Sequence, residues 1–154
     1  MALLIAAAAG SMVACSSDNS PSSETLTAAD LGAQQIKPIV EYLGAEPYRG
    51  ADLANGERLA ATCRACHTLA PGGAQRIGPN LGGLFGRRAG DLPRFDYSAA
   101  LRGAEFVWTP RALDAWLAAP YRFLPGNRMS FSGVTDPEDR TDLVAYLLTE
   151  TSTQ

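Results

Sequence analysis

Histidine and cysteine are scarce in this sequence, and their scarcity excludes two common ways of holding a small protein together. The 154 residues include one histidine and three cysteines, and Cys15 lies far from the other two cysteines. A structural zinc site needs four ligands, which this set does not supply in one place. The odd count and the uneven spacing also provide no disulfide framework. The fold is therefore built around neither zinc nor disulfides.

Aromatic and charged residues are sparse as well. Aromatic residues make up 8% of the chain and charged residues 19%, against 46% apolar residues. The formal net charge of −3 gives no overall basic field, so nothing in the composition favours binding to nucleic acid. The 15 glycines and 10 prolines indicate short helices joined by structured loops, in one modest domain with extensions.

The N-terminal segment is small or apolar throughout and ends in a cysteine. As a helix, residues 1–14 would measure about 21 Å, which is shorter than the about 30 Å of a hydrocarbon core. Residues 1–15 therefore predict a secretion signal rather than a membrane span. Residues 11–15 resemble a bacterial lipobox, so we expect a lipid on Cys15 that anchors the protein to a membrane in the bacterial periplasm. Met12 stands where leucine is usual, and an ordinary signal that leaves a soluble periplasmic protein is the alternative.

Composition divides the rest of the chain. Residues 16–30 are rich in serine and predict a flexible tether. Residues 31–51 are more apolar but are interrupted by Pro38, which predicts an N-terminal extension with a short, broken helix packed on the domain surface. The compact domain is expected at 52–150, followed by a tail at 151–154.

Helix starts are readable at three places in this domain. Asp52, Thr109 and Asp136 each stand where a capping side chain is expected, and proline follows the last two directly. The segment 68–96 is rich in glycine and proline, which predicts a long loop. No segment shows the alternation of a strand, so the predicted fold is all-α. The expected buried faces of the later helices are Leu113, Trp116, Leu117, Leu143, Val144, Tyr146 and Leu147.

The strongest chemical signal is Cys63-Arg64-Ala65-Cys66-His67. Two thiols three positions apart, followed at once by the imidazole, have the spacing of c-type haem attachment. Each thiol can add to one haem vinyl group while His67 faces the iron. A thioredoxin-like redox pair would need a βαβ setting, which is missing. We therefore predict one covalently bound haem c with iron cycling between Fe2+ and Fe3+; a chance motif in a helix is the plain alternative.

Further motifs follow this histidine in a fixed order. They are Gly78-Pro79-Asn80-Leu81, Gly86-Arg87, Tyr97-Ser98, Trp108, Leu117, Pro120, Pro125-Gly126, Met129, Phe131, Gly133 and the closing run from Asp142 to Leu147. A lone methionine more often packs in a core than binds a metal. The order and spacing of these motifs, however, make residues 52–149 resemble the class I cytochromes c of the mitochondrial and bacterial cytochrome c2 type, in which such a methionine is a ligand. The resemblance implies four to five short helices wrapped around one covalently attached haem.

The resemblance also implies roles for single residues. His67 and Met129 would be the axial ligands of the iron, and the carbonyl of Pro79 would accept a hydrogen bond from the free imidazole nitrogen. Gly56 would allow the first and last helices to cross closely under Tyr146. The remaining cofactor-binding residues would be Cys63 and Cys66 on the vinyl groups, Arg87, Tyr97 and Trp108 on a haem propionate, and Leu117 and Phe131 as haem walls. For Trp108, plain core packing is the alternative.

The chain departs from the family at a few positions that touch the haem or its supports. Trp116 stands where a tyrosine often reaches the methionine sulfur, and its indole nitrogen can donate a hydrogen bond but not accept one. Leu101, Asn127 and Ala60 replace a polar residue, a threonine and an aromatic residue. These changes bear on the reduction potential rather than on the cofactor.

An iron closed on both faces has no open position for a substrate, which leaves the gain and loss of one electron. We therefore expect a monohaem electron-transfer protein and not an enzyme. It would shuttle electrons from a quinol-oxidising complex to a terminal oxidase or similar acceptor. One alternative is the electron-transfer subunit of a multi-subunit dehydrogenase or oxidase. Another is a haem enzyme or gas sensor in which Met129 dissociates.

Positive charge is concentrated in two stretches that contain no acid. These stretches carry Arg58, Arg64, Arg76, Arg87 and Arg88 in one and Arg122 and Arg128 in the other. The segregation predicts a dipolar protein that docks on donor and acceptor proteins with acidic surfaces. We expect the protein to be a monomer. Arg87 is also accounted for by a propionate.

Overall fold

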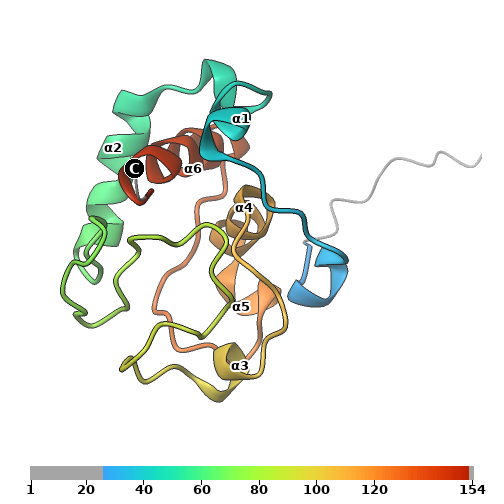
Figure 1. The fold of residues 1–154 in the computed structure, drawn as a ribbon, viewed down its shortest axis with the longest axis vertical. Coiled ribbons are helices and arrows are strands. Elements are labelled where there is room, and N and C mark those ends of the chain that lie inside the picture. Colours follow the sequence, from blue (N-terminus) through green and yellow to red (C-terminus); the bar gives the residue numbers. More distant parts are fainter. Residues whose placement is uncertain (1–25, 153–154) are drawn as a thin grey trace, which may run out of the picture.

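The computed structural model describes residues 26–152, which fold as an assembly of short helices (Figure 1). In chain order the helices are η1 (Ala28–Leu31), α1 (Ile39–Leu43), η2 (Tyr48–Gly50), α2 (Leu53–Arg64), α3 (Ala99–Arg102), α4 (Pro110–Ala118), α5 (Pro120–Phe123) and α6 (Pro137–Glu150), where η marks a 3-10 helix. Within 26–152 the only β pairing is a single bridge between Arg88 and Val107. The all-α prediction is therefore confirmed. The predicted leader, with Cys15, lies outside the described residues.

Helices α2 and α6 pack against each other and cross closely at Gly56 (Figure 1). A Cβ atom at this position would lie 2.2 Å from the carbonyl oxygen of Asp142 and 2.7 Å from Cβ of Tyr146. Any side chain would force the helices apart, so the implied close crossing under Tyr146 is confirmed. The crossing holds α2 in place, and its C-terminal end carries Cys63 and leads directly to Cys66.

The three predicted helix caps are confirmed. Asp52 accepts hydrogen bonds from two backbone N–H groups of α2, at 2.9 and 3.0 Å. The Thr109 hydroxyl accepts from Ala112 at 3.1 Å, and Asp136 accepts from Glu138 at 2.8 Å. Each cap satisfies an N–H group that has no partner inside its own helix, which sets where the helix begins.

Helices α3 and α5 were not predicted from the sequence. Each has four residues, which is too short to show a helical period of apolar positions. Ser98 begins α3 by accepting a hydrogen bond from the N–H of Leu101 at 3.2 Å. Helix α3 lies at the lower end of the domain, and α5 lies between α4 and α3 (Figure 1).

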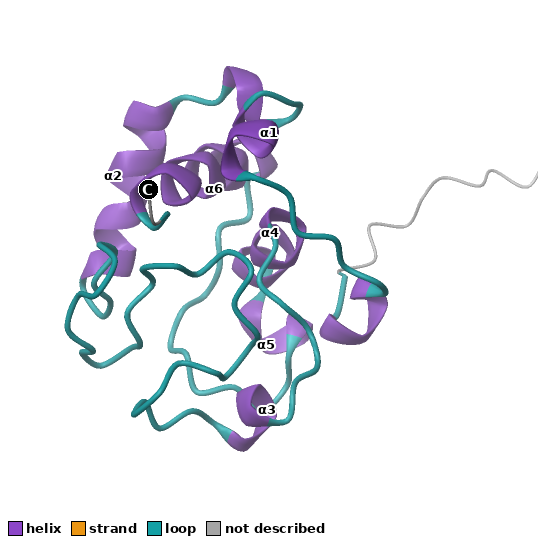
Figure 2. Cartoon of the chain, viewed as in Figure 1, coloured by secondary structure: helices purple, strands orange, loops and turns teal. Residues whose placement is uncertain are grey.

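Two long loops complete the domain, one between α2 and α3 and the other between α5 and α6 (Figure 2). The first loop contains the predicted irregular segment 68–96. It is held by the buried amide of Asn80, which donates to the carbonyls of Thr68 and Ala70 and to the Thr68 hydroxyl at 2.7 to 3.0 Å. The loop is therefore fixed by specific polar contacts although it has no regular structure.

Residues 27–51, which we call the strap, run along the outside of the domain (Figure 1). Residues 16–25 of the predicted tether at 16–30 lie outside the described residues, and its last part is corrected, because Ala28–Leu31 form a 3-10 helix. Thr27 and Asp30 close a capping box there, and the side chain of Leu31 is 4% exposed. The predicted broken helix of the extension is α1, which packs on α6 together with η2. Within 26–152 no helix is both long and apolar enough to span a bilayer.

Candidate functional site

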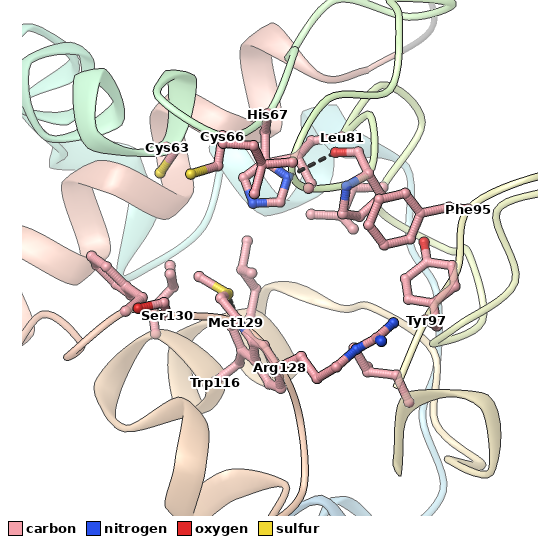
Figure 3. Close-up of a pocket in the computed structure, with 18 of the residues that line it drawn as sticks. Cys63, Cys66, His67, Leu81, Phe95, Tyr97, Trp116, Arg128, Met129 and Ser130 are labelled. Carbon is pink, nitrogen blue, oxygen red and sulfur yellow. Dashed lines mark hydrogen bonds between the residues drawn. The ribbon is translucent and has the colours of Figure 1, made fainter. Parts of the chain in front are cut away.

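A cavity of about 510 Å³ lies between the two long loops (Figure 3). Its wall contains all ten residues that were predicted to bind the cofactor. They are Cys63, Cys66, His67, Pro79, Arg87, Tyr97, Trp108, Leu117, Met129 and Phe131. The fold thus brings together residues that come from α2, α4, both long loops and the segment between α3 and α4.

The two cysteines lie at the C-terminal end of α2. Backbone N–H groups of Cys66 and His67 both bond to the carbonyl of Cys63, at 3.1 and 2.9 Å, so the helical turn continues through the motif. Both thiols are free and half-buried, and their sulfur atoms lie side by side at one end of the cavity (Figure 3). Burial raises the pKa of Cys63 and favours its neutral thiol.

His67 is held in one orientation by the loop that follows it. Its Nδ1 lies 2.7 Å from the carbonyl oxygen of Pro79, and because a carbonyl only accepts, Nδ1 carries the proton. A Cβ atom on Gly78 would lie 2.3 Å from Cε1 of the ring, so only glycine lets the loop pack against the imidazole. Burial lowers the pKa of His67 and favours the neutral ring. Its Nε2 lone pair is therefore free to bind a metal.

Met129 lies across the cavity from His67 (Figure 3). The turn before it has Gly126 in a left-handed conformation, with φ of +83°. The side chain of Asn127 stabilises this turn through three hydrogen bonds. Its buried amide donates to the carbonyls of Pro120 and Leu124, both at 2.9 Å, and accepts from the Met129 N–H at 2.9 Å. Sequence reasoning treated Asn127 only as a departure from the family, and missed that it positions the segment bearing Met129.

Trp116 contacts the methionine sulfur directly. Its indole Nε1 donates to Sδ of Met129 at 3.3 Å, and the side chain is 4% exposed. Trp116 also packs edge-on against Trp108, with 5.4 Å between ring centroids. The tryptophan thus supplies a donor to the sulfur from the position where the family often has a tyrosine.

The other end of the cavity carries a positive charge. The guanidinium of Arg87 donates to the carbonyls of Gly82 and Asn80 at 3.1 and 3.0 Å, and no described carboxylate is bonded to it. Burial lowers the pKa of Arg87, because the half-buried guanidinium is partly desolvated. Burial also raises the pKa of the neighbouring Tyr97, so its hydroxyl stays protonated. This end of the cavity would favour an anionic group.

The donor set fits one covalently attached haem. Two thiols and an imidazole occupy one side of a largely apolar cavity, a thioether lies on the other side, and the half-buried cation of Arg87 stands at the far end. Residues 26–152 contain no group of three or more histidine, cysteine or carboxylate side chains that could hold a metal ion. The fold and the site together define a small c-type haem protein.

Comparison with known proteins agrees with this class. The sequence profile of the cytochrome c family matches residues 53–151. The chain is 40% identical to cytochrome c2 of Agrobacterium tumefaciens (strain II Chrys) over 106 residues, which are 67% of this chain and 96% of the relative. It is 46% identical to cytochrome c of Chlamydomonas reinhardtii over 97 residues, covering 62% of this chain and 87% of the relative. Cytochrome c2 of Blastochloris viridis is 37% identical over 101 residues, 66% of this chain and 80% of the relative.

The chain therefore belongs to the cytochrome c family. Proteins of this family bind one haem c covalently through the Cys-x-x-Cys-His motif, which Cys63, Cys66 and His67 supply here. They carry electrons between redox proteins and are not enzymes. The profile match begins at residue 53, so the strap is not part of it.

Proposed function

We propose that His67 and Met129 are the two axial ligands of the haem iron, and that the protein is a freely diffusing or tethered one-electron carrier. The observation that carries the proposal is the placement of an imidazole and a thioether on opposite walls of one cavity (Figure 3). With both positions filled, no substrate can reach the iron. When bound, the haem supplies a one-electron couple between Fe2+ and Fe3+.

The surrounding residues would keep this centre nearly unchanged between the two oxidation states. Pro79 holds the imidazole through Nδ1, and Asn127 holds the backbone of Met129. Arg87, with Tyr97 and Trp108 beside it in the cavity wall, would balance the charge of a haem propionate that is otherwise costly to bury. Ligands that do not move contribute little reorganisation to electron transfer.

The ligand assignment is tested by the optical spectrum of the exported holoprotein. Ferric haem with a sulfur ligand has a weak far-red absorption band. We expect the wild type to show this band and Met129→Leu to lose it. Phe131→Leu changes another apolar residue of the same cavity wall and should keep it. A Met129→Leu protein with an unaltered band would refute the assignment.

The proposed partners are donor and acceptor proteins with acidic docking surfaces. Ile77 lines the cavity and is 83% exposed, which leaves an apolar contact at the cavity mouth. Arg76 beside it is exposed and donates to the carbonyl of Arg64, at the end of α2 that bears the cysteines. Arg128 on the opposite wall is paired with Asp96 at 3.0 Å. Two arginines thus flank the mouth of the cavity, where an acidic partner would approach.

This docking surface is tested by salt dependence. We expect Arg76→Gln to lower the second-order rate of electron transfer to an acidic oxidase about threefold at low ionic strength, and not at high ionic strength. Arg111→Gln is a matched control, because Arg111 is also exposed and also donates to one backbone carbonyl, that of Leu31. Equal effects of the two substitutions would contradict docking at the cavity mouth.

We further propose a bacterial periplasmic carrier that moves electrons from a quinol-oxidising complex to a terminal oxidase or similar acceptor. Two of the relatives are bacterial proteins named cytochrome c2, which supports the bacterial setting. A lipid on Cys15 would hold the carrier near membrane-bound partners at high effective concentration. A Cys15→Ala protein that still fractionates with membranes would exclude this anchor.

A further inference from the structure

The strap lies outside the family match but is fastened to the domain at a position that bears on the haem cavity. Leu31 anchors its first turn, and Ile36 lies over Gly86, with 3.6 Å from Cγ2 of the isoleucine to the position of a Cβ on the glycine. Between these two contacts, the half-buried side chain of Gln34 reaches the backbone of the segment before α4. This contact joins residues that are 73 positions apart in the chain.

Gln34 binds beside the isolated bridge between Arg88 and Val107, where residues 86–89 and 106–108 run antiparallel; we call these two paired segments the ladder. Three backbone hydrogen bonds join the two segments of the ladder. The N–H of Gly86 donates to the carbonyl of Trp108 (2.8 Å), the N–H of Trp108 to the carbonyl of Arg87 (2.9 Å), and the N–H of Ala89 to the carbonyl of Phe106 (2.9 Å). Arg88 and Val107 form the bridge between these bonds. Arg88 and Val107 are thus a non-hydrogen-bonded pair, in which the N–H and C=O groups of both residues point away from the partner segment. The N–H and C=O of Val107 therefore face outward and need other partners.

The amide of Gln34 satisfies both of these groups. Its Oε1 accepts from the Val107 N–H at 2.8 Å, and its Nε2 donates to the Val107 carbonyl at 2.8 Å. Nε2 also lies 3.3 Å from the hydroxyl of Thr109, which caps helix α4. Because Val107 N–H can only donate, this is the one orientation of the amide that satisfies all three contacts.

Val107 leads directly to the residues that contact the methionine. Trp108 follows it in the chain and packs edge-on against Trp116, which donates to Sδ of Met129. Helix α4, whose cap Gln34 also touches, carries Trp116. Gln34 thus contacts both the ladder and the helix that hold the two tryptophans against the cavity.

We propose that Gln34 is a positioning residue for Met129. By binding Val107 and the cap of α4, it fixes Trp108 and Trp116 and so stabilises coordination of the methionine sulfur. The inference rests on the proposed function, in which Met129 is an iron ligand. The strap then helps to keep Met129 bound to the iron, in addition to linking the domain to the N-terminal segment.

The test uses the full-length holoprotein and the far-red ferric band as the readout. We expect Gln34→Ala to raise the equilibrium constant for thermal loss of the band about fivefold, since it removes up to three hydrogen bonds. Gln35→Ala is the matched control, because Gln35 is the same residue type, adjacent and exposed, and no described group is bonded to its side chain. It should leave the constant unchanged.

A second control separates positioning from general loss of stability. Leu31→Ala removes buried strap packing, including at the small cavity that Leu31 shares with Phe106, but it removes no described hydrogen bond to Val107 or Thr109. It should therefore lower the unfolding temperature while shifting the band equilibrium less than Gln34→Ala does. Hydrogen exchange gives an independent readout: the Val107 amide should be protected in the wild type and in Gln35→Ala, and should exchange faster in Gln34→Ala.

The outcomes are distinguishable. A wild-type protein without the far-red band would refute the ligand assignment itself. The positioning role would be overturned if the wild type shows the band but Gln34→Ala and Gln35→Ala change the equilibrium constant for its thermal loss equally. It would also be overturned if Leu31→Ala changes that constant as much as Gln34→Ala does. An unprotected Val107 amide in the wild type would overturn it as well.

Discussion

Replacing Trp116 by phenylalanine should lower the reduction potential of the haem. The substitution removes the hydrogen bond from Nε1 to Sδ of Met129, which is 3.3 Å long in a side chain only 4% exposed. With Met129 as the proposed iron ligand, the donor would withdraw electron density from the sulfur and weaken its bond to ferric iron more than its bond to ferrous iron. Without the donor, the ferric state is therefore stabilised.

The size of the shift follows from the strength of one hydrogen bond. A buried hydrogen bond contributes about 1 kcal/mol net, and for one electron about 59 mV corresponds to about 1.4 kcal/mol. If the ferric state alone gains this energy, the potential of Trp116→Phe falls by about 40 mV. The assay is a spectroscopic redox titration of the holoprotein. The far-red band should at the same time persist to higher pH, because the sulfur binds ferric iron more tightly.

The smaller ring also leaves a cavity, so packing needs a separate control. Phe123 is buried and packs edge-on against Trp116, with 5.9 Å between centroids, but does not contact the sulfur. Phe123→Leu should lower the free energy of unfolding by about 1 kcal/mol while moving the potential much less. A potential that is unchanged or raised in Trp116→Phe, or an equal fall in Phe123→Leu, would refute the reasoning.

Three further substitutions test other parts of the structure. Gly56→Ala should destabilise the protein by about 3 kcal/mol in chemical denaturation, because its Cβ meets α6, whereas Gly103→Ala, whose Cβ is 3.4 Å from its nearest neighbour, should change little. Asn127→Ala should cost about 2 kcal/mol and weaken the far-red band, since the turn before Met129 loses three hydrogen bonds; an intact band would contradict its role. Burial, with a smaller contribution from Asp114, raises the pKa of Tyr48 to about 12. Its ordinary pKa is lower, so the folded protein should lose stability as pH rises from about 10 towards 12, and Tyr48→Phe should flatten that loss in pH-dependent denaturation.

The helix starts were predictable because a cap acts within four residues. Asp52, Thr109 and Asp136 bond to N–H groups of their own helices, so the local sequence contains the whole interaction. Helices α3 and α5 escaped prediction because four residues show no period, and they form where neighbouring segments pack on them. The tether was predicted to extend to residue 30 for a similar reason. Nothing local shows that Leu31 is buried against distant parts of the chain.

The amino-acid sequence alone determined the attachment of the cofactor, because Cys63, Cys66 and His67 are contiguous on one turn and their chemistry needs no distant partner. Resemblance supplied the other ligand and the wall residues, but not their contacts. Only the tertiary structure decided that Trp116 donates to Met129, that Arg87 is bonded to no carboxylate within residues 26–152, and that Gln34 of the strap binds the outer side of the ladder beside Trp108. These contacts join segments far apart in the chain, and their geometry exists only after the helices have packed.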